Sequence, residues 1–135
     1  MKIDRQLFRT GNPLIDSQHE AYLDLLDEFF VIGREHLTDK TKVDEALNKA
    51  IDYGLKHFIA EEQLMESVNY PGIDAHRKKH SEFSVRVEKL QRDGQYLSPD
   101  AFLHEINVVM VKWLCEQIQT YDRELAEYLM NRKNK

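Results

Sequence analysis

Apolar residues recur at helical spacing along four stretches of this chain. In the first stretch the apolar side chains fall on one helical face: Tyr22, Leu25, Leu26, Phe29 and Phe30. This stripe predicts a helix over about residues 17–37. A helix start needs a short side-chain oxygen to accept hydrogen bonds from its free amides, and Asp16 or Ser17 fits that position.

Turn signals separate this helix from the next two. Thr38-Asp39 interrupts the apolar pattern, and a second helix then runs to about residue 67. Asn69-Tyr70-Pro71-Gly72 is a strong signal for a helix stop followed by a turn. The pattern that resumes after it predicts a third helix over about residues 73–92.

The remaining signals define a fourth helix and a fold class. Gly94 suits a left-handed cap at the end of the third helix. Ser98-Pro99-Asp100 combines an N-cap, a proline at the first helical position and an acid near the positive helix end, so a fourth helix runs from there to about residue 131. No convincing strand pattern is present. Residues 1–135 are therefore expected to form one all-α domain, an antiparallel up-down-up-down four-helix bundle with a short N-terminal arm.

The composition is that of a soluble globular domain. The chain has 135 residues, of which 41% are hydrophobic and 32% are charged, and its formal net charge is −5. A net negative charge disfavours nucleic-acid binding, and no apolar run approaches the ~20 residues that cross a bilayer. The N-terminus shows no apolar signal segment, and the single cysteine, Cys115, excludes an internal disulfide. We therefore expect a cytoplasmic protein that binds neither nucleic acid nor membrane.

Histidines and carboxylates recur on the predicted helices at positions that share a face. His57 and Glu61 are four residues apart, as are His76 and His80. His19 lies on the first helix and Asp122 on the fourth, each near the apolar stripe of its helix. Burying these groups together without a cation is costly. The pattern therefore predicts a metal site in the bundle core.

The donor set narrows the kind of metal site. Imidazole and carboxylate without thiolate suit Fe, Zn, Mn or Ni. The zincin motif requires glutamate directly after the first histidine, but Arg77 follows His76. The Glu-x-x-His pairs of ferritin-like bundles are absent. Two carboxylates and several imidazoles suit a pair of metals bridged by Glu61 and Asp122.

Four segments taken in order resemble the hemerythrin family, and most closely its bacterial members. They are GNPLIDSQH, HFIAEEQLM, NYPGIDAHRKKHSEF and WLCEQIQTYD, and they span about residues 10–125. The resemblance implies two Fe ions with a bridging oxo or hydroxo group in the middle of the bundle. It implies that His19 and His57 bind the iron with an open position, and that His76 and His80 bind the other. Glu61 and Asp122 would bridge both.

The same resemblance implies a function. Members of the hemerythrin family bind dioxygen reversibly, so this chain is expected to store, deliver or scavenge dioxygen rather than to catalyse a reaction. The implied apolar pocket over the open iron consists of Tyr22, Phe58, Trp113, Leu114 and Ile118. The alternatives are a di-iron enzyme acting on peroxide or nitric oxide, an oxygen or redox sensor acting through a partner, and an iron-free bundle.

Two residues depart from the family pattern. Gln117 occupies the place of a fifth histidine, which would be the third imidazole on the iron held by His76 and His80. Three outcomes stay open: Gln117 binds iron through its oxygen, a water takes the vacant position, or the site holds one metal. Tyr22 replaces an aliphatic pocket residue, either as a simple core substitution or as a phenol that donates a hydrogen bond or an electron.

Overall fold

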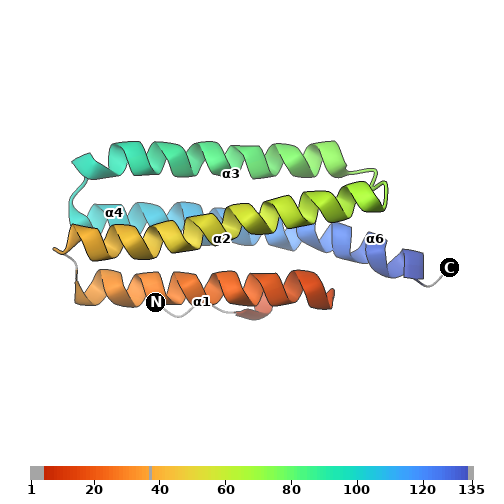
Figure 1. Cartoon of the computed structure of the whole chain (residues 1–135), viewed down its shortest axis with the longest axis horizontal. Coiled ribbons are helices and arrows are strands. Elements are labelled where there is room, and N and C mark those ends of the chain that lie inside the picture. The colour runs from red at the N-terminus through yellow and green to blue at the C-terminus, as the bar shows by residue number, and fades with distance from the viewer. Residues whose placement is uncertain (1–4, 37, 134–135) are drawn as a thin grey trace.

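The computed structural model describes residues 5–36 and 38–133, and its four helical rods run antiparallel to their neighbours along the chain (Figure 1). The first three rods are single helices: α1 (Pro13–Glu35), α2 (Lys40–Ser67) and α3 (Ile73–Asp93). The fourth rod consists of consecutive segments: α4 (Pro99–Ile106), the π-helical η3 (Asn107–Trp113), α5 (Leu114–Gln117), the π-helical η4 (Ile118–Asp122) and α6 (Arg123–Lys133). Short 3₁₀ turns precede α1 and follow α3: η1 (Arg5–Phe8) and η2 (Gly94–Tyr96). The described residues form no strand, and the predicted all-α up-down-up-down bundle is confirmed.

The first helix begins four residues earlier than the sequence pattern predicts. Asn12, rather than Asp16 or Ser17, is the N-cap, and its side-chain oxygen accepts hydrogen bonds from the amides of Leu14 and Ile15. Pro13 occupies the first helical position, where a missing N–H costs nothing. Asp16 instead accepts hydrogen bonds from the Thr10 amide and hydroxyl and from the Gly11 amide. Its carboxylate therefore ties the N-terminal arm to α1.

The loops confirm one predicted boundary and correct another. Ser98 caps α4 as predicted, because its hydroxyl accepts a hydrogen bond from the Ala101 amide. Gly94 does not form a left-handed cap: its φ is −59°, and the chain continues directly into η2. The reason for a glycine here is packing, because a Cβ at Gly94 would lie 2.5 Å from Cε2 of Phe102. The left-handed residue of the preceding turn is Asn69, with φ of 52°.

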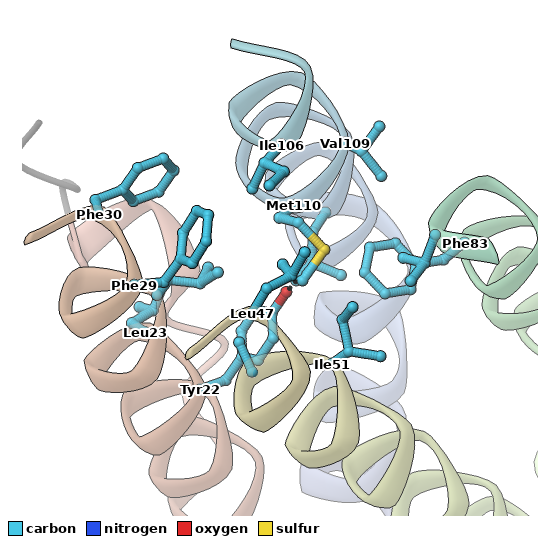
Figure 2. Packing of buried hydrophobic residues seen from close by; sticks show 14 of the residues in the cluster. Tyr22, Leu23, Phe29, Phe30, Leu47, Ile51, Phe83, Ile106, Val109 and Met110 are labelled. Carbon is cyan, nitrogen blue, oxygen red and sulfur yellow. Dashed lines mark hydrogen bonds between the residues drawn. The ribbon is translucent and has the colours of Figure 1, made fainter. Parts of the chain in front are cut away.

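Two apolar clusters fill the bundle, one toward each end. The larger surrounds Phe29 and Phe83 near the loop between α1 and α2, and Figure 2 shows its packing. The smaller joins Ile15, Met65 and Leu125 at the opposite end. Each fully buried side chain of this size contributes roughly 1.5–3 kcal/mol to folding. Since both ends are dry and packed, any polar group between them is held in fixed surroundings.

The predicted site residues lie between these two clusters. On α1, His19 stands between Ile15 of the smaller cluster and Tyr22 of the larger. On α2, Glu61 stands between Phe58 of the larger cluster and Met65 of the smaller. The apolar core is thus interrupted midway along the bundle by a layer of buried polar side chains. Each described helix is too short or too polar to cross a bilayer.

The fourth rod departs from α-helical geometry where it passes this layer. In η4 the amide of Arg123 bonds the carbonyl of Ile118, five residues earlier. Positions five apart in an α-helix face directions about 140° apart, whereas a five-residue turn brings them toward the same side. Gln117 and Asp122 are five residues apart, and both side chains are buried. The π-helical turn therefore allows one helix to direct two polar residues inward.

Candidate metal centre

Six buried side chains from all four rods form the polar layer of the core. The first three rods contribute His19 from α1, His57 and Glu61 from α2, and His76 and His80 from α3. The fourth rod contributes Asp122 from the end of η4. The most exposed of the six, His57, is only 7% accessible. Helical spacing thus brings together the six side chains singled out from the sequence.

The two carboxylates lie at the centre of this arrangement. Asp122 places Oδ2 2.9 Å from His19 Nε2 and Oδ1 2.8 Å from His76 Nε2. Glu61 places Oε2 3.3 Å from His57 Nε2, while its Oε1 lies 2.5 Å from His76 Nε2 and 3.1 Å from His80 Nε2. Each carboxylate therefore spans two sets of imidazoles, which is the arrangement of a bridging ligand.

The ligand atoms divide into two overlapping groups. The His19 group consists of His19, His57, Glu61 and Asp122, and the His76 group of Glu61, His76, His80 and Asp122. In each group the four donor atoms lie within 4.8 Å of one another. Four nitrogen and oxygen donors at this spacing fit around one cation.

Several of these atoms lack a hydrogen bond despite their burial. His57 Nε2, Glu61 Oε2 and Asp122 Oδ1 are close to neighbouring donors or acceptors, but without hydrogen-bonding geometry. Buried polar atoms in this state are rare and costly. Lone pairs that converge on shared points are what a bound cation needs. The residues present therefore fit a pair of metal ions.

Three of the four imidazoles are oriented by a second partner on Nδ1. His19 Nδ1 lies 3.1 Å from the carbonyl oxygen of Phe8, which only accepts, so Nδ1 carries the proton. His57 Nδ1 lies 2.5 Å from Gln18 Oε1, and His80 Nδ1 lies 3.3 Å from Glu62 Oε2. This tautomer leaves each Nε2 lone pair free to face a metal. These partners are not predictable from the sequence, because one is a backbone carbonyl and the others come from neighbouring helices.

Close contacts in the cluster outweigh the effect of burial on its pKa values. Burial raises the pKa of Glu61, but the close contacts of its carboxylate with the His57, His76 and His80 imidazoles bring that pKa well below its usual value. Burial lowers the pKa of His76, but contacts with Asp122 and Glu61 raise it to about 9. Burial also lowers the pKa of His19, and contacts with Asp122 again raise it overall. The raised pKa values of His19 and His76 favour protonated imidazoles in the metal-free protein, so a metal ion must compete with protons for these nitrogen atoms.

A small cavity adjoins the His19 group. Its volume is about 10 Å³, close to the space of one water. The residues lining it are His19, Tyr22, Gly54, His57, Phe58, Phe83, Leu114, Ile118 and Asp122. A larger cavity of about 470 Å³ near Thr38 and Leu97, at the end of the bundle, contains none of the six ligand candidates.

Four of the five residues expected to form an oxygen pocket line this small cavity. The exception is Trp113, which lies behind it and stacks on Phe83 with ring centroids 5.2 Å apart. The Tyr22 ring lines the cavity, but its hydroxyl points to the sulfur of Met110 at 3.8 Å (Figure 2). Gly54 and Phe83 complete the lining, and sequence reasoning missed them because neither carries a chemical signature.

Comparison with known proteins identifies the family. A model described as the hemerythrin HHE cation binding domain matches residues 10–129. The chain belongs to the hemerythrin family. It is 27% identical to a bacteriohemerythrin of Stenotrophomonas maltophilia over 117 residues, which cover 87% of this chain and 74% of that protein. It is 25% identical to a bacteriohemerythrin of Clostridium acetobutylicum over 122 residues, or 89% of this chain and 95% of that protein.

A third relative is a myohemerythrin of Theromyzon tessulatum, which is 32% identical over 111 residues that cover 79% of this chain and 85% of that protein. No solved structure matches the chain. The hemerythrin resemblance read from the four sequence segments is therefore confirmed at the level of the family.

Gln117 is a buried polar residue outside both metal groups. Its side chain is 4% accessible, and neither Oε1 nor Nε2 has a hydrogen-bond partner. Leaving a carboxamide buried and unsatisfied costs about 1–3 kcal/mol. Gln117 ends α5, directly before the π-helical turn that ends at Asp122. The carboxamide of Gln117 is therefore buried in the core with its oxygen free to bind a further group.

Proposed function

We propose that this hemerythrin is a non-haem di-iron protein that binds dioxygen reversibly, for storage, delivery or scavenging. The observation that carries the proposal is the pair of four-donor groups that share Glu61 and Asp122. Two shared carboxylates favour two metals held close together. The relatives named bacteriohemerythrin and myohemerythrin support iron and dioxygen as the metal and the ligand.

The residues divide between two irons. His19 and His57 would hold one iron, His76 and His80 would hold the other, and Glu61 and Asp122 would be shared between them. When bound, two ferrous ions with an oxo or hydroxo group would supply the electrons and the open coordination position that dioxygen uptake requires. The four imidazoles serve as neutral donors, and those of His19, His57 and His80 are oriented by their Nδ1 partners.

Gln117 serves as the seventh ligand, through its carboxamide oxygen, to the iron held by His76 and His80. Its burial and its unsatisfied amide support this role over a solvent-filled position. A carboxamide oxygen is a weaker donor to iron than an imidazole. The iron on that side is therefore held less tightly than an iron with three imidazoles.

The chain also controls access to the open side of the site. Tyr22, Phe58, Leu114 and Ile118 are each at most 5% exposed and line the cavity beside His19 and His57. Apolar walls exclude water, and water exclusion slows loss of electrons from the reduced site. A cavity of about 10 Å³ favours a very small ligand.

The test replaces one ligand and one matched histidine outside the site. His57→Ala should abolish dioxygen uptake by the reduced protein while far-ultraviolet circular dichroism stays close to that of the wild type. His104 is exposed on α4 and lies outside both groups, so His104→Ala should retain uptake. Uptake of dioxygen by the His57 variant would show that the ligand assignment is wrong.

Gln117 favours a competing function, a di-iron enzyme that reduces hydrogen peroxide to water with two electrons from an external donor. A weaker donor on the second iron leaves that iron more open to an added oxidant. Catalytic consumption of hydrogen peroxide by the wild type in the presence of an electron donor, lost in Gln117→His, would establish this alternative. Reversible uptake of dioxygen without peroxide turnover would establish the carrier.

A further inference from the structure

The two metal groups differ in the charge of the partners behind their imidazoles. In the His19 group, His19 donates to the Phe8 carbonyl and His57 to the Gln18 carboxamide, and both acceptors are neutral. In the His76 group, His80 donates through Nδ1 to Glu62 Oε2, a carboxylate, at 3.3 Å. Among the Nδ1 partners in the described part of the chain, only this one is anionic.

Glu62 is held in place from its other side. Arg77 Nε lies 3.3 Å from Glu62 Oε1, which leaves Oε2 to accept from His80. Arg77 also pairs with Glu66, one helical turn further along α2. The side chain of Glu62 is 29% exposed, so it is partly shielded from solvent. The contact with Arg77 therefore helps to hold the Glu62 carboxylate in its orientation toward His80.

The His80 ring is fixed as well. It stacks on Phe58 with centroids 4.0 Å apart and an interplanar angle of 11°. Rotation of the ring about its bond to the chain is restricted by this contact, so Nδ1 stays directed at Glu62 while Nε2 faces Glu61 at 3.1 Å. His80 is thus placed between two carboxylates, one at the site and one behind it.

A charged hydrogen-bond acceptor on Nδ1 changes how strongly the imidazole binds a metal through Nε2. Hydrogen bonds to an ionised carboxylate are roughly twice as strong as those to a neutral oxygen. By drawing on the Nδ1 proton, the carboxylate raises the basicity of Nε2 and its strength as a ligand. The His76 group, whose His80 has this anionic partner, is also the group to which the proposed function assigns Gln117 in place of an imidazole.

We propose that Glu62 is a positioning residue that strengthens His80 as a ligand and so compensates for Gln117 in the His76 group. The inference rests on the proposed di-iron function, and it assigns a role to a residue outside both metal groups. A purely structural alternative treats Glu62–Arg77 as a surface ion pair, which would contribute little to anything measured at the site.

The experiment titrates metal-free protein with Co²⁺ against a chelator and compares Glu62→Gln with Glu66→Gln. Glu66→Gln is the matched control, because it removes a carboxylate from the same helix and the same Arg77 partner without contacting His80. Glu62→Gln keeps the size of the side chain and an acceptor oxygen but removes the charge. It should weaken one of two Co²⁺ binding steps about 10–100-fold, whereas Glu66→Gln should leave both steps unchanged.

A second substitution identifies the affected step. Gln117→His should tighten the step that belongs to the His76 group, and the same step should be the one that Glu62→Gln weakens. In the double variant, Gln117→His should restore most of the affinity lost with Glu62. Equal thermal unfolding of the metal-free variants checks that folding is unchanged.

The outcomes separate this inference from the proposed function. Equal titrations for Glu62→Gln and Glu66→Gln, weakening of both steps alike, or absence of rescue by Gln117→His would overturn the role of Glu62 alone. A protein that binds two Co²⁺ with the expected differences, but whose iron form takes up no dioxygen, would overturn the proposed function and keep this inference. A wild type that binds a single Co²⁺ would overturn both.

Discussion

The close approach of Tyr22 to Gly54 gives a prediction that tests the packing beside the site. Gly54 lies in the interior of α2, where glycine destabilises a helix by about 1 kcal/mol relative to alanine. A Cβ at this position would lie 3.2 Å from Tyr22 Cε1. Tyr22 is 3% exposed and packs in the larger apolar cluster, so its ring has little room to move. We therefore expect that the glycine accommodates the ring.

The magnitude follows from two opposing effects. Gly54→Ala gains about 1 kcal/mol of helix propensity and loses roughly 1–3 kcal/mol through overpacking against the ring. The net result should be a free energy of unfolding that is unchanged to about 2 kcal/mol lower. In a Tyr22→Leu background the ring is absent, so the same substitution should stabilise the protein by up to about 1 kcal/mol. The coupling between the two positions should therefore be roughly 1–3 kcal/mol.

The assay is urea denaturation of metal-free protein, monitored by circular dichroism, which gives the free energy of unfolding. It compares the wild type, Gly54→Ala, Tyr22→Leu and the double variant. Gly33→Ala is the control, because its Cβ would meet the flexible end of Leu103 rather than a buried ring, and its effect should not depend on Tyr22. An equal effect of Gly54→Ala with and without the tyrosine ring would show that Gly54 is not needed to accommodate the Tyr22 ring.

Three further predictions concern the site and the arm. In metal-free protein the pKa of His76 is raised to about 9. Its contribution to stability is therefore complete below the unfolded-state pKa of about 6.5 and is lost as pH rises through 9. Urea denaturation at a series of pH values should show a loss of at most roughly 3 kcal/mol in the free energy of unfolding, and this loss should be absent when metal is bound. Asp122→Asn should lower the metal content of both groups, measured by elemental analysis, because Asp122 belongs to each; full loading would remove it from the ligand set. Arg5→Ala removes three partly exposed ion pairs that hold the N-terminal arm on α1, so it should cost about 1 kcal/mol or less and lose its effect in high salt; a larger, salt-independent loss in denaturation curves would point to packing instead.

Helical periodicity was sufficient to predict the fold and to predict that the six polar residues lie together in the core. Residues four apart share a helix face whatever surrounds them, so the His57–Glu61 and His76–His80 pairs were predictable from spacing. The turn at Asn69 was predictable for a similar reason, since it depends on the local sequence. These features require no knowledge of the rest of the molecule.

Features that depend on contacts between distant segments were not predictable. The sequence pattern predicts the start of α1 too late because Asp16, a good capping residue in isolation, accepts hydrogen bonds from Thr10 and Gly11 of the arm. It predicts a left-handed cap at Gly94 because only the folded structure brings Phe102 against this glycine. The π-helical turn before Asp122 has no signature in composition, and neither does the pairing of His80 with Glu62 on a neighbouring helix.

The central claim is that Glu61 and Asp122 are shared by two irons, and iron content per chain tests it most directly. The measurement is elemental analysis of iron-loaded protein, combined with the visible spectrum of the reduced form before and after exposure to air. Two irons per chain are expected, with a visible absorption band that appears with air and disappears when dioxygen is removed. One iron or none per chain, or a spectrum that changes irreversibly with air, would show that Glu61 and Asp122 do not support a di-iron site that binds dioxygen reversibly.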